Sequence, residues 1–375
     1  MNQPHVLQLC HGYEPPFLDV ARQYAGLFAD TPYKVTTVYL TGEFSDQVAN
    51  ESSSDEVFFL ENTSRDVRGL KRKQIKQLQR ICEQRQFSFA IAHRFKPLYI
   101  CSHIPDLFTV GVHHAFGDYQ RKTRRWFVNR RQQRLALLGV SNAVRDDIRH
   151  CLPHWSSDRI QTLYNRVDYE QLKANLVERE AARKYLGLTQ NQYVFANVGR
   201  LHPDKDQTTL LKAFALIAGQ LPNAVLAILG QGRLESELKQ LAQSLGIAKQ
   251  VLFLGMVPEA AQYYKAFDSF VLTSDHEPFG MVLLEAMAAG LPVIATDCGG
   301  GKEVVEGCGQ LFPLGDAQQL ASHMTQIYGL SSQDKTALAD KMDAKVTQNF
   351  SYSVVKDHFW QLPFIKPYAM KMGVA

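Results

Sequence analysis

Short apolar runs alternate along the chain with segments whose apolar residues recur at helical spacing. The runs that predict strands in the first half are Val6–Leu9, Lys34–Leu40, Phe87–Ala92, Leu107–Val112 and Leu137–Val140. Between them, segments such as Phe17–Phe28 and Val67–Glu83 have the periodicity of helices. Strand and helix in series predict a parallel sheet, because parallel strands need a long crossover connection.

The second half repeats this pattern more cleanly. Its predicted strands are Tyr193–Val198, Ala224–Leu229, Val251–Leu254, Ser269–Leu272 and Pro292–Ala295. Its predicted helices are Thr208–Gly219, Leu234–Leu245 and Met281–Ala289. We expect Gly246 and Gly290 to end two of these helices in the left-handed conformation that glycine adopts most easily.

The chain has 375 residues, which is too long for one ordinary core and suits two domains. A polar turn over Thr162–Asp168 is the predicted linker. The predicted domains are therefore residues 1–165 and 166–351, each an α/β domain with a doubly wound parallel sheet. The tail, residues 352–375, is predicted to pack back onto the first domain.

Composition argues against a disulfide-rich, a secreted or a membrane-spanning protein. Apolar residues make up 45% and charged residues 21%, with a formal net charge of +4, which is an ordinary globular balance. The six cysteines have no metal-binding spacing, so we expect reduced thiols. Neither a signal peptide nor an apolar run of about 18 residues is apparent. These features predict a cytoplasmic protein, either free or peripheral at the inner membrane.

The stretch Glu277–Glu285 carries the most informative chemistry. A helix is predicted to begin near Phe279 or Gly280, and its unpaired N–H groups and dipole suit a pyrophosphate. Glu277 lies just before this terminus, where a carboxylate can accept hydrogen bonds from sugar hydroxyls. Glu285 lies about 1.5 turns into the helix and can accept from a ribose. Alone, two glutamates at this spacing are more often a helix-terminus charge and a surface residue.

Two cations follow the strand Tyr193–Val198, at the edge where open α/β sheets bind ligands. Arg200 and Lys205 could stabilise the charge that develops on a departing diphosphate. Taken alone, such loop cations are usually solvated.

The motifs together resemble a known family. The segment Thr273–Thr296, with its Glu277-Pro278-Phe279-Gly280 core, closely resembles the signature of retaining GT-B glycosyltransferases of group 1, the family-four type. Five further segments agree with that family in order: Val140–Val144, Tyr164–Asp168, Val198–Asp206, Leu229–Gly232 and Phe253–Val257. The resemblance is strong over about Leu138–Gly307, and Arg166 stands where the family commonly has glycine.

The resemblance implies a GT-B fold, in which two Rossmann-like domains face each other across a cleft. Residues 1–165 would then bind the acceptor and residues 166–351 the donor. The implied activity is transfer of a sugar, with retained configuration, from a nucleoside diphosphate sugar (UDP-linked favoured over GDP-linked) to a glycan or glycolipid. The implied pathway is synthesis of bacterial lipopolysaccharide core or another surface polysaccharide. No metal and no cofactor are expected, since no Asp-x-Asp follows a strand in a position that suggests a metal-bound diphosphate. The resemblance implies front-face attack assisted by the leaving oxygen, so neither a conventional general base nor a covalent glutamate is expected.

The resemblance also assigns roles to residues. Arg200 and Lys205 would hold the diphosphate, Glu277 the sugar and Glu285 the ribose, while Met256 and Val257 would line the base. The donor-contacting residues implied are Gly12, Gly199, Arg200, Lys205, Gly232, Met256, Val257, Glu277, Pro278, Phe279, Gly280, Met281, Val282 and Glu285. The catalytic residues implied are His113, Glu277, Arg200 and Lys205.

The first half offers weaker candidates. Gly12 follows the first strand, where relatives often have two glycines that approach the donor phosphates. His113 and His114 follow a later strand, and relatives often have a histidine there near the reacting carbon. His113 aligns better, but the sequence leaves open which of the two lines the cleft. His93 and Asp118 are further candidates.

A basic stretch, residues 121–134, carries seven cations around Trp126 and Phe127. One interpretation is a helix whose basic face meets an anionic acceptor or anionic lipid, with Trp126 at the interface. The other is a solvated charged face around a core-facing aromatic pair. Nucleic acid is not expected, since no recognised nucleic-acid motif is present.

Three other functions compete with the transferase. A sugar-nucleotide epimerase shares the two-domain plan but lacks the Pro-Phe-Gly signature. A catalytically silent sugar-nucleotide-binding partner subunit would not need both glutamates, Arg200 and Lys205. A dehydrogenase is least favoured, because no G-x-G-x-x-G follows a strand.

Overall fold

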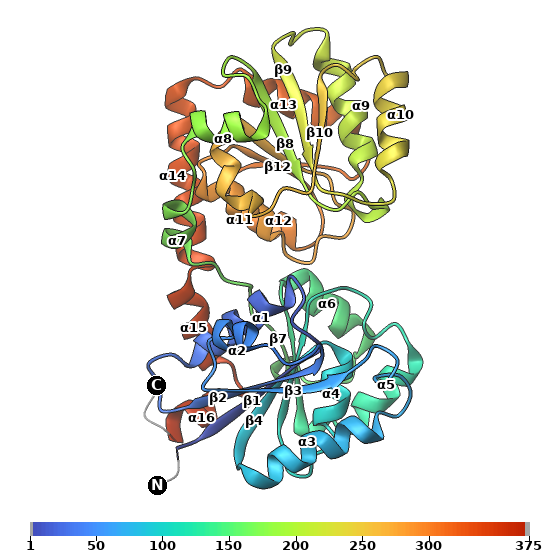
Figure 1. The fold of residues 1–375 in the computed structure, drawn as a ribbon, viewed down its shortest axis with the longest axis vertical. Coiled ribbons are helices and arrows are strands. Elements are labelled where there is room, and N and C mark those ends of the chain that lie inside the picture. The colour runs from blue at the N-terminus through green and yellow to red at the C-terminus, as the bar shows by residue number, and fades with distance from the viewer. Residues whose placement is uncertain (1–2, 372–375) are drawn as a thin grey trace. The chain divides into compact units, whose positions relative to one another are not determined.

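The computed structural model describes residues 3–371 and divides the chain into two compact units. Unit 1 takes the chain up to Asn165 and again from Val355, and unit 2 is Arg166–Val354 (Figure 1). The chain thus passes between units at 165/166 and at 354/355, where the sequence predicted 165/166 and 351/352.

Unit 1 is built on a seven-stranded parallel sheet in the order β3-β2-β1-β4-β5-β6-β7. Its strands are β1 (His5–Cys10), β2 (Lys34–Thr41), β3 (Glu56–Asn62), β4 (Phe87–His93), β5 (Thr109–His113), β6 (Leu135–Gly139) and β7 (Ile160–Thr162). The five predicted strands are confirmed to within about two residues at their ends. The sequence missed β3 and β7, which are the two edge strands. Neither is a continuous buried run: β3 is half-buried and β7 has only three residues.

Helices cover both faces of this sheet (Figure 1). They are α1 (Phe17–Ala25), α2 (Asp46–Glu51), α3 (Arg72–Gln84), α4 (Phe95–Cys101), α5 (Lys122–Asn129), α6 (Asn142–Cys151), α15 (Tyr352–Gln361) and α16 (Lys366–Lys371). The tail joins the core of unit 1 through aromatic contacts. The rings of Phe359 and Trp360 lie edge-on to Phe28, at centroid distances of 5.6 and 5.5 Å. The Trp360 indole N–H donates to the Leu27 carbonyl at 3.0 Å.

Unit 2 has a six-stranded parallel sheet in the order β10-β9-β8-β11-β12-β13. Its strands are β8 (Tyr193–Val198), β9 (Ala224–Leu229), β10 (Val251–Gly255), β11 (Ser269–Leu272), β12 (Val293–Thr296) and β13 (Gln310–Phe312). Three of the five predicted strands match to the residue. The sequence missed β13, a three-residue edge strand.

The helices of unit 2 are α7 (Tyr169–Ala174), α8 (Arg179–Leu186), α9 (Gln207–Ala218), α10 (Glu235–Ser244), α11 (Met281–Ala288), α12 (Gly299–Val305), α13 (Ala317–Tyr328) and α14 (Ser332–Asn349). Gly246 and Gly290 have φ values of 73° and 72°, so the predicted left-handed helix ends are confirmed.

A fully buried apolar core joins one face of this sheet to helices α9, α10 and α13. Its larger members are Phe195, Leu210, Phe214, Leu226, Ile228, Leu238, Val271, Ile294, Phe312, Leu320 and Met324. Since α9 is apolar around most of its circumference, the helix is buried between the sheet and its helical neighbours.

In each sheet the direction in which successive strands are added reverses once. In unit 1 the chain builds β1, β2 and β3 to one side, then restarts with β4 on the other side of β1. In unit 2 it builds β8, β9 and β10 and restarts with β11 beside β8. At such a switch point the following loops diverge and leave a crevice at the carboxyl ends of the strands, which is where open α/β sheets bind ligands.

Across residues 3–371, no helix combines the length and the apolar character that a bilayer crossing requires. All six cysteines are free thiols.

Candidate functional site

An ion pair occupies the switch point of unit 2. The Lys205 ammonium lies 2.7 Å from Glu277 Oε2, and the two side chains are only 17% and 11% exposed. Lys205 ends the short 3-10 turn Pro203–Lys205 after β8, and Glu277 follows β11. These residues are 72 positions apart in the chain, and the adjacency of β8 and β11 brings them together.

The two loops are joined by backbone hydrogen bonds that hold this pair in place. The Asp275 N–H donates to the Asp204 carbonyl at 3.0 Å, and the Thr273 hydroxyl donates to the Lys205 carbonyl at 2.8 Å. The Ser274 hydroxyl also donates to Glu277 Oε2, at 3.2 Å. Two donors therefore converge on one carboxylate oxygen. In the described part of the chain no hydrogen bond reaches the other, Oε1.

Three consecutive glycines begin α12 and press against the Glu277 segment. A Cβ atom on Gly299 would lie 2.4 Å from the Glu277 carbonyl oxygen, and one on Gly300 would lie 2.2 Å from the Pro278 carbonyl oxygen. The Gly300 N–H donates to the Glu277 carbonyl at 2.7 Å. These glycines were not among the residues predicted from the sequence. A run of glycines at a strand-to-helix turn is the signal that could have found them.

Helix α11 begins at Met281, one or two residues later than predicted. Gly280 is its N-terminal cap with φ 98°, a left-handed conformation that suits glycine. As the first residues of the helix, Met281 and Val282 have N–H groups without intrahelical acceptors. Phe279 is buried, and its ring lies edge-on to Phe350 at 5.4 Å. Its side chain therefore packs the core of unit 2, and its expected contact with the donor remains a prediction.

Glu285 lies further along α11 and accepts a hydrogen bond from the Tyr264 hydroxyl at 3.1 Å. Tyr264 is fully buried. Burial, together with the charge of Glu285, raises the pKa of Tyr264 well above its ordinary value, so the phenol stays protonated and donates. The tyrosine therefore orients the Glu285 carboxylate.

Arg200 is the most exposed of the predicted site residues. Its side chain is 72% exposed and makes only a loose ion pair with Asp204 at 3.4 Å. Its backbone is held by Gln207, whose amide donates to the Arg200 carbonyl at 3.1 Å. Burial acts to raise the pKa of Asp204, but the hydrogen bond from His202 and the charges of Lys205 and Arg200 outweigh it and lower that pKa. Arg200 is thus a solvent-exposed cation on a loop whose backbone is held by hydrogen bonds.

The predicted glycines shape the loops after β8 and β9. A Cβ on Gly230, which has φ 134°, would lie 1.9 Å from the Gly199 carbonyl oxygen. A Cβ on Gly232 would lie 2.2 Å from the Leu201 carbonyl oxygen. These glycines therefore let two loops touch backbone to backbone, and their predicted donor contacts remain predictions.

Met256 and Val257 follow β10 at the same edge of the sheet. The Met256 side chain is exposed and that of Val257 is half-buried. The site residues of unit 2 thus share the carboxyl edge of one sheet, as their positions after strands predicted.

The neighbouring histidines of unit 1, His113 and His114, have different surroundings. His113 is fully buried, with Nδ1 2.7 Å from Asp118 Oδ2 and Nε2 3.0 Å from the Tyr119 hydroxyl. His114, by contrast, helps to line a cavity of about 200 Å³. His113 can therefore orient Asp118, and its predicted role at the reacting carbon remains a prediction.

The buried His93 pairs with His114, which is half-buried. Their rings stack with centroids 5.4 Å apart, and His93 Nδ1 lies 3.2 Å from His114 Nε2. Burial lowers the pKa of His93 to about 3 and that of His114 well below its ordinary value. Both imidazoles are therefore neutral at physiological pH, so one donates a hydrogen bond to the other.

Gly12 is buried beside the end of β2, where a Cβ atom would lie 2.8 Å from the Thr41 Oγ1. The Thr41 hydroxyl donates to the His11 carbonyl at 2.7 Å. The glycine thus allows the loop after β1 to lie against β2, while its predicted approach to donor phosphates remains a prediction.

The basic stretch forms α5, and neither sequence interpretation describes it fully. Phe127 is buried, but Trp126 is 58% exposed, so the two aromatics are not a core-facing pair. The Arg131 guanidinium lies over the Phe127 ring at 4.1 Å, and Arg130 lies over Trp126 at 4.6 Å. Arg124 points inward to Asp118, at 2.6 Å.

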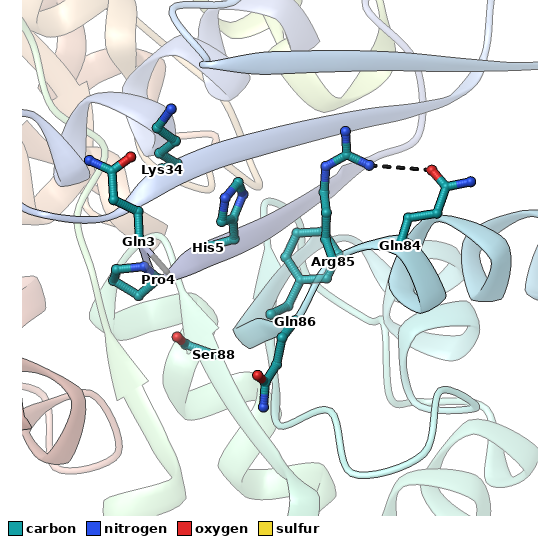
Figure 2. Close-up of a pocket in the computed structure, with 9 residues that line it drawn as sticks. Gln3, Pro4, His5, Lys34, Gln84, Arg85, Gln86 and Ser88 are labelled. Carbon is teal, nitrogen blue, oxygen red and sulfur yellow. Dashed lines mark hydrogen bonds between the residues drawn. The ribbon is translucent and has the colours of Figure 1, made fainter. Parts of the chain in front are cut away.

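A larger cavity of about 490 Å³ lies at the opposite edge of the unit 1 sheet (Figure 2). His5, Lys34 and Ser88, at the first residues of β1, β2 and β4, line it. Arg85 also lines it and donates to Gln84 at 3.5 Å. Because parallel sheets bind ligands at their carboxyl ends, this cavity is not the candidate site.

Across residues 3–371, no three His, Cys, Asp or Glu side chains are grouped so as to hold a metal ion.

Comparison with known proteins agrees with this geometry. Residues 178–344 match the family model of glycosyl transferases group 1. Unit 2 contains a glycosyltransferase group 1 domain. The matched region of this domain includes both members of the Lys205–Glu277 pair, the Gly230–Gly232 loop and helix α11.

Two curated relatives each match just under half of the chain. The lipopolysaccharide core biosynthesis glycosyltransferase LpsE of Rhizobium meliloti is 33% identical over 176 residues, covering 46% of this chain and 50% of LpsE. The UDP-Gal:alpha-D-GlcNAc-diphosphoundecaprenol alpha-1,3-galactosyltransferase of Escherichia coli is 32% identical over 174 residues, covering 45% of each chain. The chain therefore spans half or less of the curated relatives it matches.

A solved structure extends the likeness to both units. HepE of Anabaena, in complex with UDP and glucose, superposes with a TM-score of 0.76 at 22% identity, over 94% of this chain and 97% of HepE. The predicted fold class is confirmed: two Rossmann-like parallel-sheet domains of the GT-B glycosyltransferase type.

Proposed function

We propose that this protein is a retaining glycosyltransferase that moves a sugar from a nucleoside diphosphate sugar to a glycan or glycolipid acceptor. The observation that carries the proposal is the Lys205–Glu277 ion pair at the switch point of unit 2. The cation and the carboxylate of this pair follow β8 and β11 at the carboxyl edge of the sheet, which is the edge where open α/β sheets bind ligands. The group 1 glycosyltransferase domain around this pair supports the same activity.

The donor would bind along the carboxyl edge of the unit 2 sheet. Lys205 and the exposed Arg200 would neutralise the diphosphate, assisted by the first N–H groups of α11. Glu277 already accepts two hydrogen bonds on Oε2, so Oε1 is the oxygen positioned to accept from sugar hydroxyls. Glu285, oriented by Tyr264, would accept from the ribose. We favour a UDP-linked donor, because the structurally similar HepE was solved with UDP and glucose.

Catalysis would depend on stabilising the leaving diphosphate more strongly in the transition state than in the ground state. As the sugar–phosphate bond breaks, negative charge grows on the leaving oxygen beside Lys205 and Arg200. The acceptor hydroxyl would attack from the side of the departing diphosphate, and that diphosphate would take the hydroxyl proton. This course retains the configuration of the sugar and needs neither a covalent glutamate nor a metal ion.

We propose that unit 1 binds the acceptor and that the acceptor belongs to lipopolysaccharide core or another surface polysaccharide. LpsE and the galactosyltransferase of E. coli carry names of that kind, which supports the assignment. We place the reaction in the cytoplasm, with α5 touching an anionic inner-membrane surface through exposed Trp126 and Arg130. Sedimentation with anionic liposomes that is unchanged in Trp126→Ala/Arg130→Gln would remove the membrane contact from the proposal.

Two experiments test the function. Thermal unfolding with UDP-glucose, UDP-galactose or GDP-mannose identifies the donor, because a ligand at about 100 times its Kd stabilises by about 2.7 kcal/mol. The donor that shifts the transition is then incubated, radiolabelled, with and without a deacylated core oligosaccharide. Transfer to the oligosaccharide supports the proposal. A change of donor stereochemistry without acceptor indicates an epimerase, and donor binding without any turnover indicates a silent subunit.

Matched variants assign the activity to the site. Lys205→Ala and Glu277→Ala should lower kcat about a hundredfold or more, since each removes a group that faces the developing charge or the sugar. Lys212→Ala and Glu237→Ala remove the same charges from exposed positions on α9 and α10 and should leave kcat unchanged. Parental transfer rates in folded Lys205→Ala and Glu277→Ala would refute the assignment.

A further inference from the structure

A cavity of about 200 Å³ in unit 1, the one that His114 helps to line, lies at that unit's own switch point. Its wall includes His11 after β1, Arg94 and Lys96 after β4, and His114 after β5. Because β1 and β4 are the neighbours between which the sheet changes direction, the cavity occupies the ligand-binding crevice of this fold. Its volume of about 200 Å³ corresponds to about seven water molecules, so it suits one small chemical group rather than an oligosaccharide.

Positive charge dominates the lining of this cavity. Arg94, Lys96 and Arg124 all contribute to it, and Asp118 is the lining carboxylate. Asp118 is already engaged, since its two oxygens lie 2.7 Å from His113 and 2.6 Å from Arg124. Within residues 3–371, neither Arg94 nor Lys96 forms an ion pair. Two cations at the crevice are therefore uncompensated.

Neighbouring cations repel one another across this region. The pKa of Lys96 is lowered by burial and then by the charges of Arg68, Arg124 and Arg94. The pKa of Lys71 is lowered in the same way, by burial and by Lys96 and Arg124. An anion in the cavity would relieve this repulsion, and its oxygens would be closest to Arg94 and Lys96.

The backbone of Arg94 is an independent sign of function. Arg94 has φ 74° and ψ 170°, a conformation almost restricted to glycine. The surrounding structure imposes it, because the Arg94 N–H donates to the Val112 carbonyl at 2.8 Å. Glycine would fit this backbone without strain. The Arg94 guanidinium lies 4.7 Å from the centroid of the Phe17 ring, a contact that leaves its charge without a counter-ion among the described residues and so available to an anion at the cavity.

A buried polar atom on the same wall also lacks a partner. His11 Nδ1 is inaccessible to solvent and has no hydrogen-bond partner in the described part of the chain. Burial and the charges of Lys96 and Arg94 lower the pKa of His11, which favours the neutral ring. A neutral imidazole with a free ring nitrogen can donate to an oxygen of a bound group.

We propose that this cavity binds an anionic group of the acceptor, a phosphate or a carboxylate, held by Arg94 and Lys96. This inference rests on the proposed function, because it treats unit 1 as the acceptor domain. A guanidinium offers paired N–H donors that match two oxygens of a phosphate or carboxylate, and an ammonium adds a point charge. The anion can belong to a sugar phosphate, to a uronic acid or to the phosphate of a lipid carrier.

Calorimetric titration of the full chain distinguishes these sources. The probes are inorganic phosphate, glucose 6-phosphate, glucuronate, farnesyl phosphate in neutral detergent, and glucose as the uncharged control. Binding of an anionic probe without binding of glucose supports the proposal, and the tightest probe identifies the source. Equal binding of glucose and the anionic sugars, or no binding of any anion, would overturn it.

Two variants locate the site. Arg94→Gly removes the guanidinium but suits the backbone, so phosphate affinity should fall at least tenfold. The melting temperature should change little, because relief of the strained backbone offsets the lost contact with Phe17. Arg94→Gln/Lys96→Gln should abolish measurable binding. The matched control, Lys76→Gln/Arg80→Gln, removes the same charges from exposed positions on α3 and should change affinity less than twofold. Equal loss in the control would overturn the site.

A separate readout keeps this test independent of the proposed function. Binding of UDP-glucose depends on unit 2 and should be the same in all these proteins. If the anion binds but UDP-glucose does not, the donor proposal is wrong and the cavity still stands as an anion site. If UDP-glucose binds and the anion does not, the cavity proposal is wrong and the donor site is unaffected.

Discussion

The Lys205–Glu277 ion pair should stabilise unit 2 as well as serve the donor, and a double-mutant cycle can separate the two contributions. In Lys205→Ala the Glu277 carboxylate keeps only the Ser274 hydroxyl as a donor, at 3.2 Å. Breaking a fully buried pair on one side costs about 3–5 kcal/mol. Because these side chains are 17% and 11% exposed, we expect about 2–3 kcal/mol here.

The reverse substitution should cost less. In Glu277→Ala the flexible Lys205 stem can carry its ammonium towards water, so we expect a loss of about 1–2 kcal/mol. The double variant removes both charges, so its free energy of unfolding should be about equal to that of Lys205→Ala, the less stable of the two single variants. The coupling free energy is then about 1–2 kcal/mol, well above the roughly 0.5 kcal/mol scatter of independent sites.

Urea unfolding measures the cycle and contains an internal control. All three tryptophans, Trp126, Trp155 and Trp360, lie in unit 1, so their fluorescence follows that unit alone. Circular dichroism follows both units. A loss of 2 kcal/mol should lower the midpoint of the unit 2 transition by about 1 M urea. Additive losses, with coupling below about 0.5 kcal/mol, would show that the contact contributes nothing to stability and would refute the reasoning.

Three further predictions concern the backbone, pH and metal. Gly230→Ala should destabilise unit 2 by about 3 kcal/mol in urea unfolding, because its Cβ would lie 1.9 Å from the Gly199 carbonyl oxygen at φ 134°. Gly219→Ala, where the new Cβ meets no atom within 4 Å, should cost nothing, and equal losses in the two variants would contradict the steric argument. His93 and His114 have pKa values depressed by burial, so the unfolded chain takes up protons below about pH 6.5 while the native state does not. Each should therefore lower stability by up to about 2 kcal/mol between pH 7 and pH 5, measured from the fluorescence transition. His93→Phe should flatten that slope, and an unchanged slope would count against a neutral histidine pair. Millimolar EDTA should leave sugar transfer unchanged, and a loss of activity restored by Mg²⁺ would contradict a metal-independent mechanism.

Much of the fold could be predicted from local pattern, because buried parallel strands are continuous apolar runs that need no partner to be recognised. Ten of the thirteen strands, nine in central positions together with the edge strand β10, have such runs and were predicted, and β8, β9 and β11 were predicted to the residue. The edge strands β3, β7 and β13 were missed. Each has a neighbour on one side only, so its sequence is short or only half-buried, and pairing with the sheet decides its conformation.

For the candidate site as well, local sequence pattern predicted one part and the pairing of strands decided the other. The residue types of the donor site and their order after strands were evident from sequence, because the ends of parallel strands share one edge. The contact between Lys205 and Glu277, and the glycines Gly299 and Gly300 beneath Glu277, were decided by which strands are neighbours. Local pattern carries no information on that order.

Two histidines of unit 1 show most clearly that local sequence does not decide where a side chain lies. His113 and His114 are adjacent in the sequence, yet one is buried against Asp118 and Tyr119 and the other lines a cavity. Successive residues at a strand end point to opposite sides, so a shift of one residue exchanges core for surface. The sequence by itself determined the two α/β domains and the chemistry at their strand ends. Only the tertiary structure decided which side chains meet, because strand order and side-chain direction depend on packing between segments far apart in the chain.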